Sequence, residues 1–164
     1  MEHTLPNFLG IGVPKAGSTW LYELLKSHPD VYVPPSRREV RFLTQVPERT
    51  LSWYKEFFPE DSAGYAAIGE VTPHYLYCSE AQLSFLRREM PGTKQFILIL
   101  RHPVDRIYSH YWFRRRTTNL SVSFSEFIEE NEGFLSGSRY VEPIERWFQY
   151  FAREQLLILL FEKD

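Results

Sequence analysis

The feature that most constrains the fold is a short apolar run that leads into a loop of small residues and one lysine. Residues 8–20 read FLGIGVPKAGSTW, and a helical pattern continues to about residue 27. We expect a strand near residues 7–13, a tight loop, and a helix from about 17 to 27. Amide groups at the start of a helix, together with the ammonium group of Lys15, can bind a phosphate-like anion. The sequence therefore predicts an anion-binding strand–loop–helix unit.

The position of Lys15 restricts the kind of anion. Loops that bind nucleoside triphosphates follow the pattern G-x-x-x-x-G-K-[ST], with lysine directly after the second glycine. Here Lys15 lies two residues before Gly17, and Ser18 and Thr19 follow that glycine. The loop departs from the triphosphate pattern, so a small-molecule kinase is a disfavoured interpretation.

A second strand–loop–helix pattern places an arginine and a serine near a sheet edge. Residues 96–100, FILIL, indicate a buried strand, and Arg101 follows it. Pro103 suits the first position of a helix, and Ser109 lies about two turns along it. Ligands of open parallel sheets bind at the carboxyl ends of the strands, and an arginine with a hydroxyl suits a terminal phosphate. The apolar face expected for this helix comprises Val104, Ile107, Tyr108, Tyr111 and Trp112.

The rest of the chain continues the alternation of strands and helices. We expect a strand near residues 66–71, a last buried strand at 156–161, and an irregular stretch at 31–64. Capping boxes beginning at Ser79 and Ser123 predict two helices, and a further helix carries a core stripe of Ile144, Trp147, Phe148 and Phe151. This alternation predicts a single α/β domain with a central parallel sheet.

Composition excludes some classes of function. The net charge of −2 gives no overall basic field for nucleic acid or membrane binding. Cys78 is the one cysteine, so an intramolecular disulfide is impossible, and we expect it to be a small buried or semi-buried residue. The sequence shows no acidic metal site, no signal peptide and no apolar run of 18 residues, which favours a cytoplasmic location.

The two loop segments together resemble sulfotransferases that use 3′-phosphoadenosine-5′-phosphosulfate (PAPS). Residues 14–19 resemble the 5′-phosphosulfate loop P-K-x-G-[ST]-[ST], and residues 101–111 resemble the 3′-phosphate motif R-x-P-x-x-R-x-x-S-x-Y. The resemblance implies a three-layer α/β/α fold like that of P-loop NTPases. It also implies that Arg101 and Ser109 bind the 3′-phosphate and that Lys15 neutralises the leaving group. The residues it places around the 5′-phosphosulfate are Lys15, Ala16, Gly17, Ser18, Thr19 and Trp20.

Three residues are alternatives for the catalytic base. Residues 39–43, EVRFL, resemble the E-x-x-F-F element of glycan-type sulfotransferases such as the heparan sulfate enzymes, in which the glutamate is the proposed base. Residues 53–59, WYKEFFP, match another block of that subfamily. Glu39 is therefore our first choice, ahead of His74 and Glu70. Residues 69–75 resemble G-E-K-T-P-x-Y, but Val71 replaces the lysine that assists at the sulfuryl group in the family.

The resulting functional prediction is transfer of a sulfuryl group from PAPS to a hydroxyl or amine of a carbohydrate or small molecule, with PAP as product. The substitution at Val71 leaves a second interpretation open, a catalytically impaired PAP- or PAPS-binding interaction module. The sequence does not identify the acceptor. Arg114, Arg115 and Arg116 could bind an anionic acceptor or the cofactor's phosphate, but three consecutive helix residues point in different directions, so we favour a solvated helix end.

The resemblance extends to residues 156–164, LLILLFEKD, which resemble the family's strand ending in Y-E-D. Full-length family members continue past this strand, so we expect a domain truncated at its C-terminus, with exposed apolar surface that favours a homo-oligomer. Glycan-acting relatives are anchored in the Golgi membrane, which makes a Golgi-lumenal location the alternative if an anchor has been removed.

Overall fold

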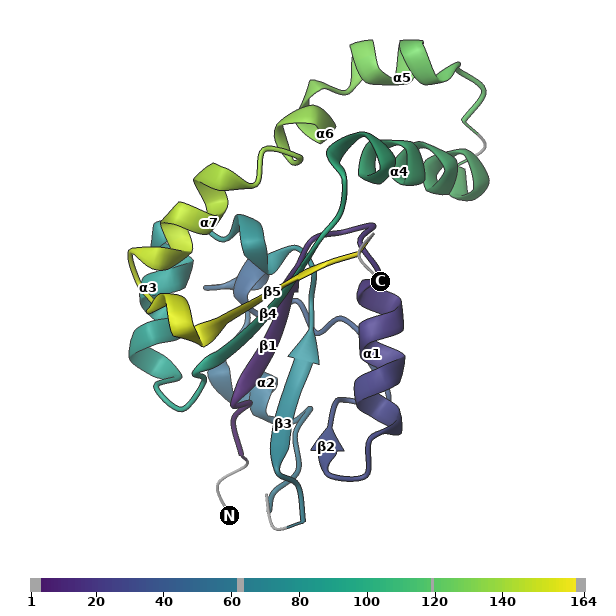
Figure 1. The fold of residues 1–164 in the computed structure, drawn as a ribbon. Helices are drawn as coiled ribbons and strands as arrows, with labels where there is room; N and C mark the ends of the chain where they lie inside the picture. The colour runs from purple at the N-terminus through teal and green to yellow at the C-terminus, as the bar shows by residue number, and fades with distance from the viewer. Residues whose placement is uncertain (1–3, 62–63, 119, 162–164) are drawn as a thin grey trace.

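A computed structural model describes residues 4–61, 64–118 and 120–161. Within these residues a parallel sheet lies at the centre, as the sequence predicts (Figure 1). Its order is β2 (Val31–Tyr32), β3 (Ala67–Val71), β1 (Phe8–Gly12), β4 (Gln95–Leu100) and β5 (Leu156–Leu160).

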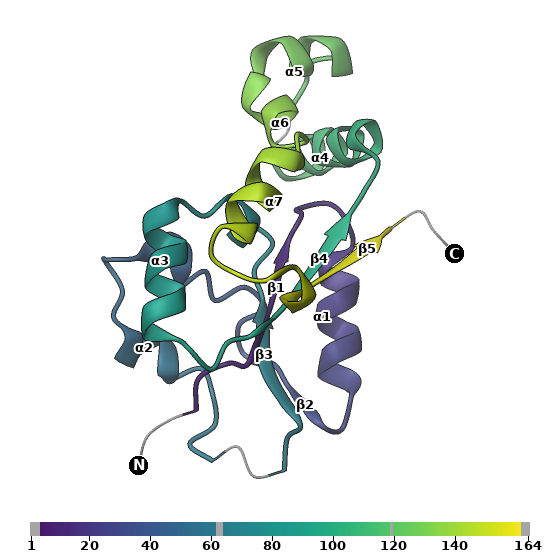
Figure 2. The same cartoon turned by 60° about the vertical axis from the view of Figure 1, so that its left-hand side comes forward.

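Helices cover both faces of this sheet, which gives the predicted three-layer α/β/α arrangement. One face carries α1 (Ser18–Ser27), and the other carries α2 (Leu51–Lys55), α3 (Glu80–Glu89) and α7 (Val141–Phe148) (Figures 1 and 2). Past the carboxyl ends of the strands lie α4 (Pro103–Thr118), α5 (Phe124–Glu130) and α6 (Glu132–Ser136). Short 3₁₀ turns are η1 (Leu43–Gln45), η2 (Tyr75–Tyr77) and η3 (Arg153–Gln155).

The core forms where apolar strands meet apolar helix faces. Every residue of β1 is buried, as expected for a strand that pairs on both sides and is covered on both faces. The Trp147 ring on α7 lies 4.9 Å from the Phe96 ring on β4, and its indole N–H donates to the carbonyl of Leu76. Burial of large apolar side chains such as these stabilises the fold by roughly 1.5–3 kcal/mol each. The predicted core stripe is thus confirmed at Trp147.

The predicted helix starts at Ser79 and Ser123 are confirmed as capping boxes. In each, the serine hydroxyl accepts from the amide three residues later, and the side chain at that position accepts from the serine amide. These reciprocal bonds satisfy backbone donors that the helix cannot satisfy internally.

Several burial expectations are wrong. The strand at 156–161 exists as β5, but it is exposed, with Leu157 at 54%. It is the last strand of the sheet and pairs only with β4 among the described strands. Residues 162–164 of the terminal block lie outside the described residues.

The stretch at 31–64, expected to be irregular, contains β2, η1 and α2.

The face expected on α4 is also only partly buried. Ile107 and Tyr111 are buried, but Val104, Tyr108 and Trp112 are exposed. Most of α4 extends beyond the sheet, so it lacks the broad support that would bury the whole stripe (Figure 1). Arg106, on the same helix, is buried and donates to the hydroxyl of Ser138. No helix among the described residues is both long and apolar enough to span a membrane.

Candidate active site

The predicted anion loop joins β1 to α1 and leaves amide donors open at the helix start. Gly17 is the N-cap, in a left-handed conformation with φ of 87°, and no side chain caps the helix there. The first backbone bond of the helix is from the amide of Leu21 to the carbonyl of Gly17. The amides of Ser18, Thr19 and Trp20 therefore precede the internal bonding of α1, where a helix favours a bound anion.

Lys15 supplies a positive charge at this loop. Its ammonium nitrogen lies 3.2 Å from the centroid of the Phe113 ring, a cation–π contact. Partial burial lowers the pKa of Lys15, and the nearby charges of Arg116 and Arg38 lower it further. Lys15 also has a φ of 72°, a conformation that is uncommon for residues other than glycine.

Arg101 connects the end of β4 to the same loop. Its guanidinium donates to the carbonyl oxygen of Lys15 over 3.0 Å and lies 4.8 Å from the centroid of the Phe161 ring. That ring also packs against Gly17, where an added Cβ would approach it to 2.9 Å. Arg101 and Phe161 therefore help to fix the backbone of the loop.

A cavity of about 420 Å³ brings together the three residues assigned to catalysis, Lys15, Glu39 and His74. Loop residues Gly17, Ser18 and Thr19 line it as well. Pro14, the first residue of the loop motif, also lines it. Residues that the sequence did not assign to the site complete the lining: Arg38, Arg41, Pro73, His110 and Phe113. The cavity is thus faced by the positive charge of Lys15, by two groups that can accept a proton, Glu39 and His74, and by a loop with open amides.

Glu39 is held by two arginines. One carboxylate oxygen accepts from Nε and Nη2 of Arg41, at 2.8 and 2.6 Å, and the other oxygen lies 4.0 Å from Arg38. Arg38 also donates to the hydroxyl of Thr19 in the anion loop. The glutamate is therefore oriented toward the loop by a fixed network of charges.

Glu70 is completely buried and does not line the cavity, which disfavours it as the base. Its carboxylate accepts from the hydroxyls of Tyr54, Thr72 and Tyr75 and from the backbone amide of Val40. Burial raises its pKa, and these four donors lower it in part. This residue organises the site and does not face an acceptor.

His74 lines the cavity, and its ring is only partly covered by neighbouring groups. Burial of its ring lowers the pKa, and the positive charge of Arg41 lowers it further, so the imidazole is neutral at pH 7 and can accept a proton. Val71, two residues after Gly69, is buried against Gly10 and does not line the cavity. Residue 71, where the motif G-E-K-T-P-x-Y has its lysine, therefore contributes no charge to the site.

The other residues assigned to donor binding lie outside this cavity. Arg101 and Ser109 are not part of its lining. Ala16, which is fully buried, and Trp20, which is 60% exposed, are not part of the lining either. Arg114, Arg115 and Arg116 are exposed, as expected for a solvated helix end.

Two residues of the cavity had weak or no sequence signals. His110 follows the expected phosphate ligand Ser109 directly, which could have marked it as a neighbour of the site. Phe113 carries no chemical signature, and only the fold brings it to Lys15.

The described residues include neither a side-chain cluster suited to a metal ion nor a reactive thiol. No group of three or more His, Cys, Asp or Glu side chains among them is placed to hold a metal ion. Cys78 is buried as predicted, and burial raises the pKa of its thiol to about 12. Such a thiol is a poor nucleophile at neutral pH.

Comparison with known proteins shows the family of the chain. The family model described as "Sulfotransferase domain" matches residues 5–163. The human protein "Bifunctional heparan sulfate N-deacetylase/N-sulfotransferase 3" is 33% identical over 175 residues, covering 94% of this chain and 20% of the relative. The human "Heparan sulfate glucosamine 3-O-sulfotransferase 6" is 30% identical, covering 96% and 47%. The chain thus spans less than half the length of these curated relatives.

Solved structures show the same fold. A sulfotransferase from Alicyclobacillus acidocaldarius superposes with a TM-score of 0.82 and 28% identity, covering 97% of this chain and 74% of that one. A sulfotransferase domain from the curacin biosynthetic pathway has a TM-score of 0.60 and 16% identity, which supports the fold alone.

Proposed function

Because this chain belongs to the sulfotransferase domain family, we propose that it transfers a sulfuryl group from PAPS to a hydroxyl or amine of a carbohydrate acceptor. The observation that carries the proposal is the single cavity in which Lys15, Glu39 and His74 face the open amides of the anion loop. The similarity to sulfotransferases named for heparan sulfate supports a carbohydrate over another small molecule.

The loop and its surroundings fit the donor. The amides at the start of α1 and the ammonium of Lys15 would hold the 5′-phosphosulfate, and Arg101 with Ser109 would hold the 3′-phosphate. Bound PAPS supplies an activated sulfuryl group. Lys15 stabilises the negative charge that develops on the departing phosphate, which is the form of electrostatic catalysis that a fixed cation provides best.

Glu39 is our proposed base for the acceptor. Its carboxylate lines the same cavity as Lys15, and Arg41 fixes the carboxylate through two bonds to one oxygen. The other oxygen can then receive the proton of an acceptor hydroxyl or amine. His74 remains the alternative because its neutral ring lines the same cavity.

Ligand-induced thermal shifts test the donor assignment. We expect PAP to raise the melting temperature, and ATP with or without magnesium to leave it unchanged. Arg101→Ala should weaken PAP binding about tenfold or more, because an arginine–phosphate contact is a strong charge-assisted interaction. Arg88→Ala is the matched control, since Arg88 is exposed on α3 and bonds Glu89. Stabilisation by ATP instead of PAP would contradict the assignment.

Transfer of radiolabelled sulfate then separates an enzyme from a binding module. Val71 favours the second possibility, because the position of the family lysine here carries a buried apolar side chain. An active protein should lose transfer in Lys15→Ala while it remains folded. A protein that binds PAP but transfers sulfate to no carbohydrate acceptor would be an impaired binding module.

A further inference from the structure

Three cationic side chains line the active-site cavity among the described residues: Lys15, Arg38 and Arg41. His74 and His110 line it too, but burial and neighbouring positive charges lower the pKa of both rings, that of His110 to about 4. Both imidazoles are therefore neutral at pH 7. The side-chain positive charge that this cavity offers to a transferred group comes from the three cations.

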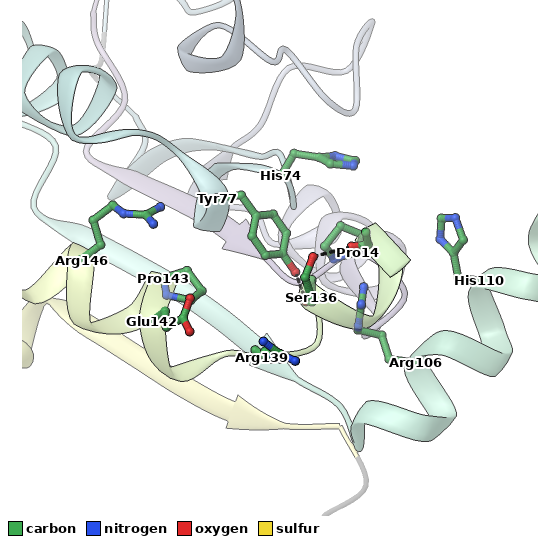
Figure 3. Close-up of a pocket in the computed structure, with 12 residues that line it drawn as sticks. Pro14, His74, Tyr77, Arg106, His110, Ser136, Arg139, Glu142, Pro143 and Arg146 are labelled. Atoms are coloured by element: carbon green, nitrogen blue, oxygen red, sulfur yellow. Dashed lines mark hydrogen bonds between the residues drawn. The ribbon is translucent and has the colours of Figure 1, made fainter. Parts of the chain in front are cut away.

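The arginines of the adjoining cavity, drawn in Figure 3, do not add to these charges. That cavity, of about 420 Å³, shares His74 and His110 with the active-site cavity. Its arginines come from α4, from α7 and from the segment before α7 (Figure 3). None of them, Arg106, Arg139 or Arg146, is part of the active-site lining.

Of the two arginines in the active-site lining, Arg41 is the one whose charge is paired. Its Nε and Nη2 atoms both donate to one carboxylate oxygen of Glu39, at 2.8 and 2.6 Å. Arg38 donates from Nη1 to the neutral hydroxyl oxygen of Thr19 over 3.0 Å, and its Nη2 lies 4.0 Å from the other oxygen of Glu39. A separation of 4.0 Å is too long for a hydrogen bond. Arg38 can therefore turn N–H donors toward a further anion.

Arg38 also lies between the two groups that the transfer connects. Thr19 belongs to the anion loop, where the donor phosphate would lie, and Glu39 is the proposed base, where the acceptor would lie. After burial and the charge of Arg116, the charge of Arg38 lowers the pKa of Lys15, so the guanidinium is near the ammonium. A group that passes from the loop to an acceptor at Glu39 therefore passes the guanidinium of Arg38.

We propose that Arg38 is a catalytic residue that binds the oxygens of the transferred sulfuryl group. Glu39 takes the proton of the acceptor while the acceptor oxygen or nitrogen bonds to sulfur. The bond from sulfur to the 5′-phosphate oxygen breaks, and its electron pair leaves on PAP. Lys15 neutralises the charge on that phosphate, and the paired N–H donors of Arg38 stabilise the charge on the sulfuryl oxygens.

This inference rests on the proposed function and deepens it. Residue 71 contributes no charge to the site, because Val71 is buried and apolar. With Arg38 at the sulfuryl group, the cavity has a second cation for transfer besides Lys15. The substitution at residue 71 is then compatible with an active enzyme.

Calorimetric titration of PAPS and of PAP, without an acceptor, tests the contact. The two ligands have similar total charge and differ by the sulfuryl group, so the ratio of their affinities isolates contacts to that group. In Arg38→Ala we expect PAPS binding to weaken about tenfold and PAP binding to change by less than about twofold. Arg38→Lys should restore part of the PAPS affinity, because it keeps the charge but lacks the paired donors. The Arg38 side chain is 48% exposed, so both variants should fold.

Transfer of radiolabelled sulfate gives the second measurement. Arg38→Ala should lower kcat about 100-fold, as expected for loss of a donor that stabilises developing charge. Arg49→Ala is the matched control, since Arg49 is exposed, stacks on the Trp53 ring at 4.8 Å and does not line the cavity. It should leave kcat and both affinities unchanged.

Three results would overturn the inference: equal weakening of PAPS and PAP in Arg38→Ala, unchanged PAPS binding in that variant, or an unchanged kcat. Each of them leaves the proposed function intact, because the wild type still binds the donor and transfers sulfate. A wild type that binds neither ligand, or that transfers no sulfate, overturns the proposed function itself.

Discussion

The carboxylate of Glu70 accepts a hydrogen bond of 3.1 Å from the backbone N–H of Val40, the residue that follows Glu39. The same carboxylate accepts from Tyr54 on α2 and Tyr75 on η2, and the hydroxyl of Thr72 accepts from the amide of Arg41. A buried acid at the end of β3 thus fixes the segment that carries Glu39 and Arg41 into the cavity.

Replacement of Glu70 should therefore destabilise the protein and disturb the site. In Glu70→Ala the donors of Val40, Tyr54, Thr72 and Tyr75 lose their acceptor in the interior, and each unsatisfied buried group costs about 1–3 kcal/mol. Because some donors will find water or other partners, we expect the free energy of unfolding to fall by about 3 kcal/mol or more. Urea denaturation measures it. Glu89→Ala, at an exposed pair with Arg88, should change stability by less than about 1 kcal/mol. Similar losses in both variants would refute the structural role of Glu70.

Gly17→Ala tests the conformation of the anion loop. A side chain at φ of 87° is strained by about 1–2 kcal/mol, and the new Cβ would lie 2.9 Å from the Phe161 ring. We expect a lower melting temperature and a smaller stabilisation by PAP. Gly92→Ala is the control, because its added Cβ would meet no atom within 4 Å. An unchanged PAP response in Gly17→Ala would show that the loop does not hold the donor.

Phe113→Leu tests the contact that holds the ammonium of Lys15. An aromatic ring stabilises the charged form by about 0.5–2 kcal/mol, so its removal should lower the pKa of Lys15 beyond the lowering already caused by burial. Lys15 attracts the anionic donor only when protonated. As the pH is raised, PAP binding should consequently be lost at a pH about 0.5–1 unit lower in the variant than in the wild type. A titration of PAP affinity against pH measures this midpoint. Phe148→Leu, on α7, is the control and should leave this midpoint unchanged. An unchanged midpoint in Phe113→Leu would argue against the contact between Lys15 and Phe113.

The pH dependence of transfer separates Glu39 from His74 as the base. Burial and Arg41 lower the pKa of His74 below its ordinary value of 6.5, so the ring gains its proton only as the pH falls below that value. If His74 were the base, the rate would fall in that range and His74→Gln would abolish the pH dependence.

With Glu39 as the base, His74→Gln should retain transfer, and Glu39→Gln should lower kcat by about 100-fold or more. Initial rates of sulfate transfer from pH 4.5 to 8 measure both variants. If His74→Gln abolished the fall in rate at low pH and Glu39→Gln had only a mild effect, His74 and not Glu39 would be the catalytic base.

The local sequence determined the elements that position the site. The apolar runs near 7–13 and at 96–100 predict buried strands, and the serines at 79 and 123 predict helix starts, because strand burial and helix capping depend on residues close together in the chain. The loop containing Lys15 and Gly17 was recognisable for the same reason, since its geometry is set by a few neighbouring residues.

The tertiary structure alone decided which side chains meet. Lys15 and Phe113 are far apart in sequence, and so are Val40 and Glu70, so their contacts depend on how α4 and β3 are placed in the fold. The same holds for burial: β5 is as apolar as β4, yet its position at the sheet edge leaves it exposed. Periodicity reports which residues share a face of an element. What that face contacts is fixed only when distant elements pack, because burial and charge pairing are properties of the assembled neighbourhood.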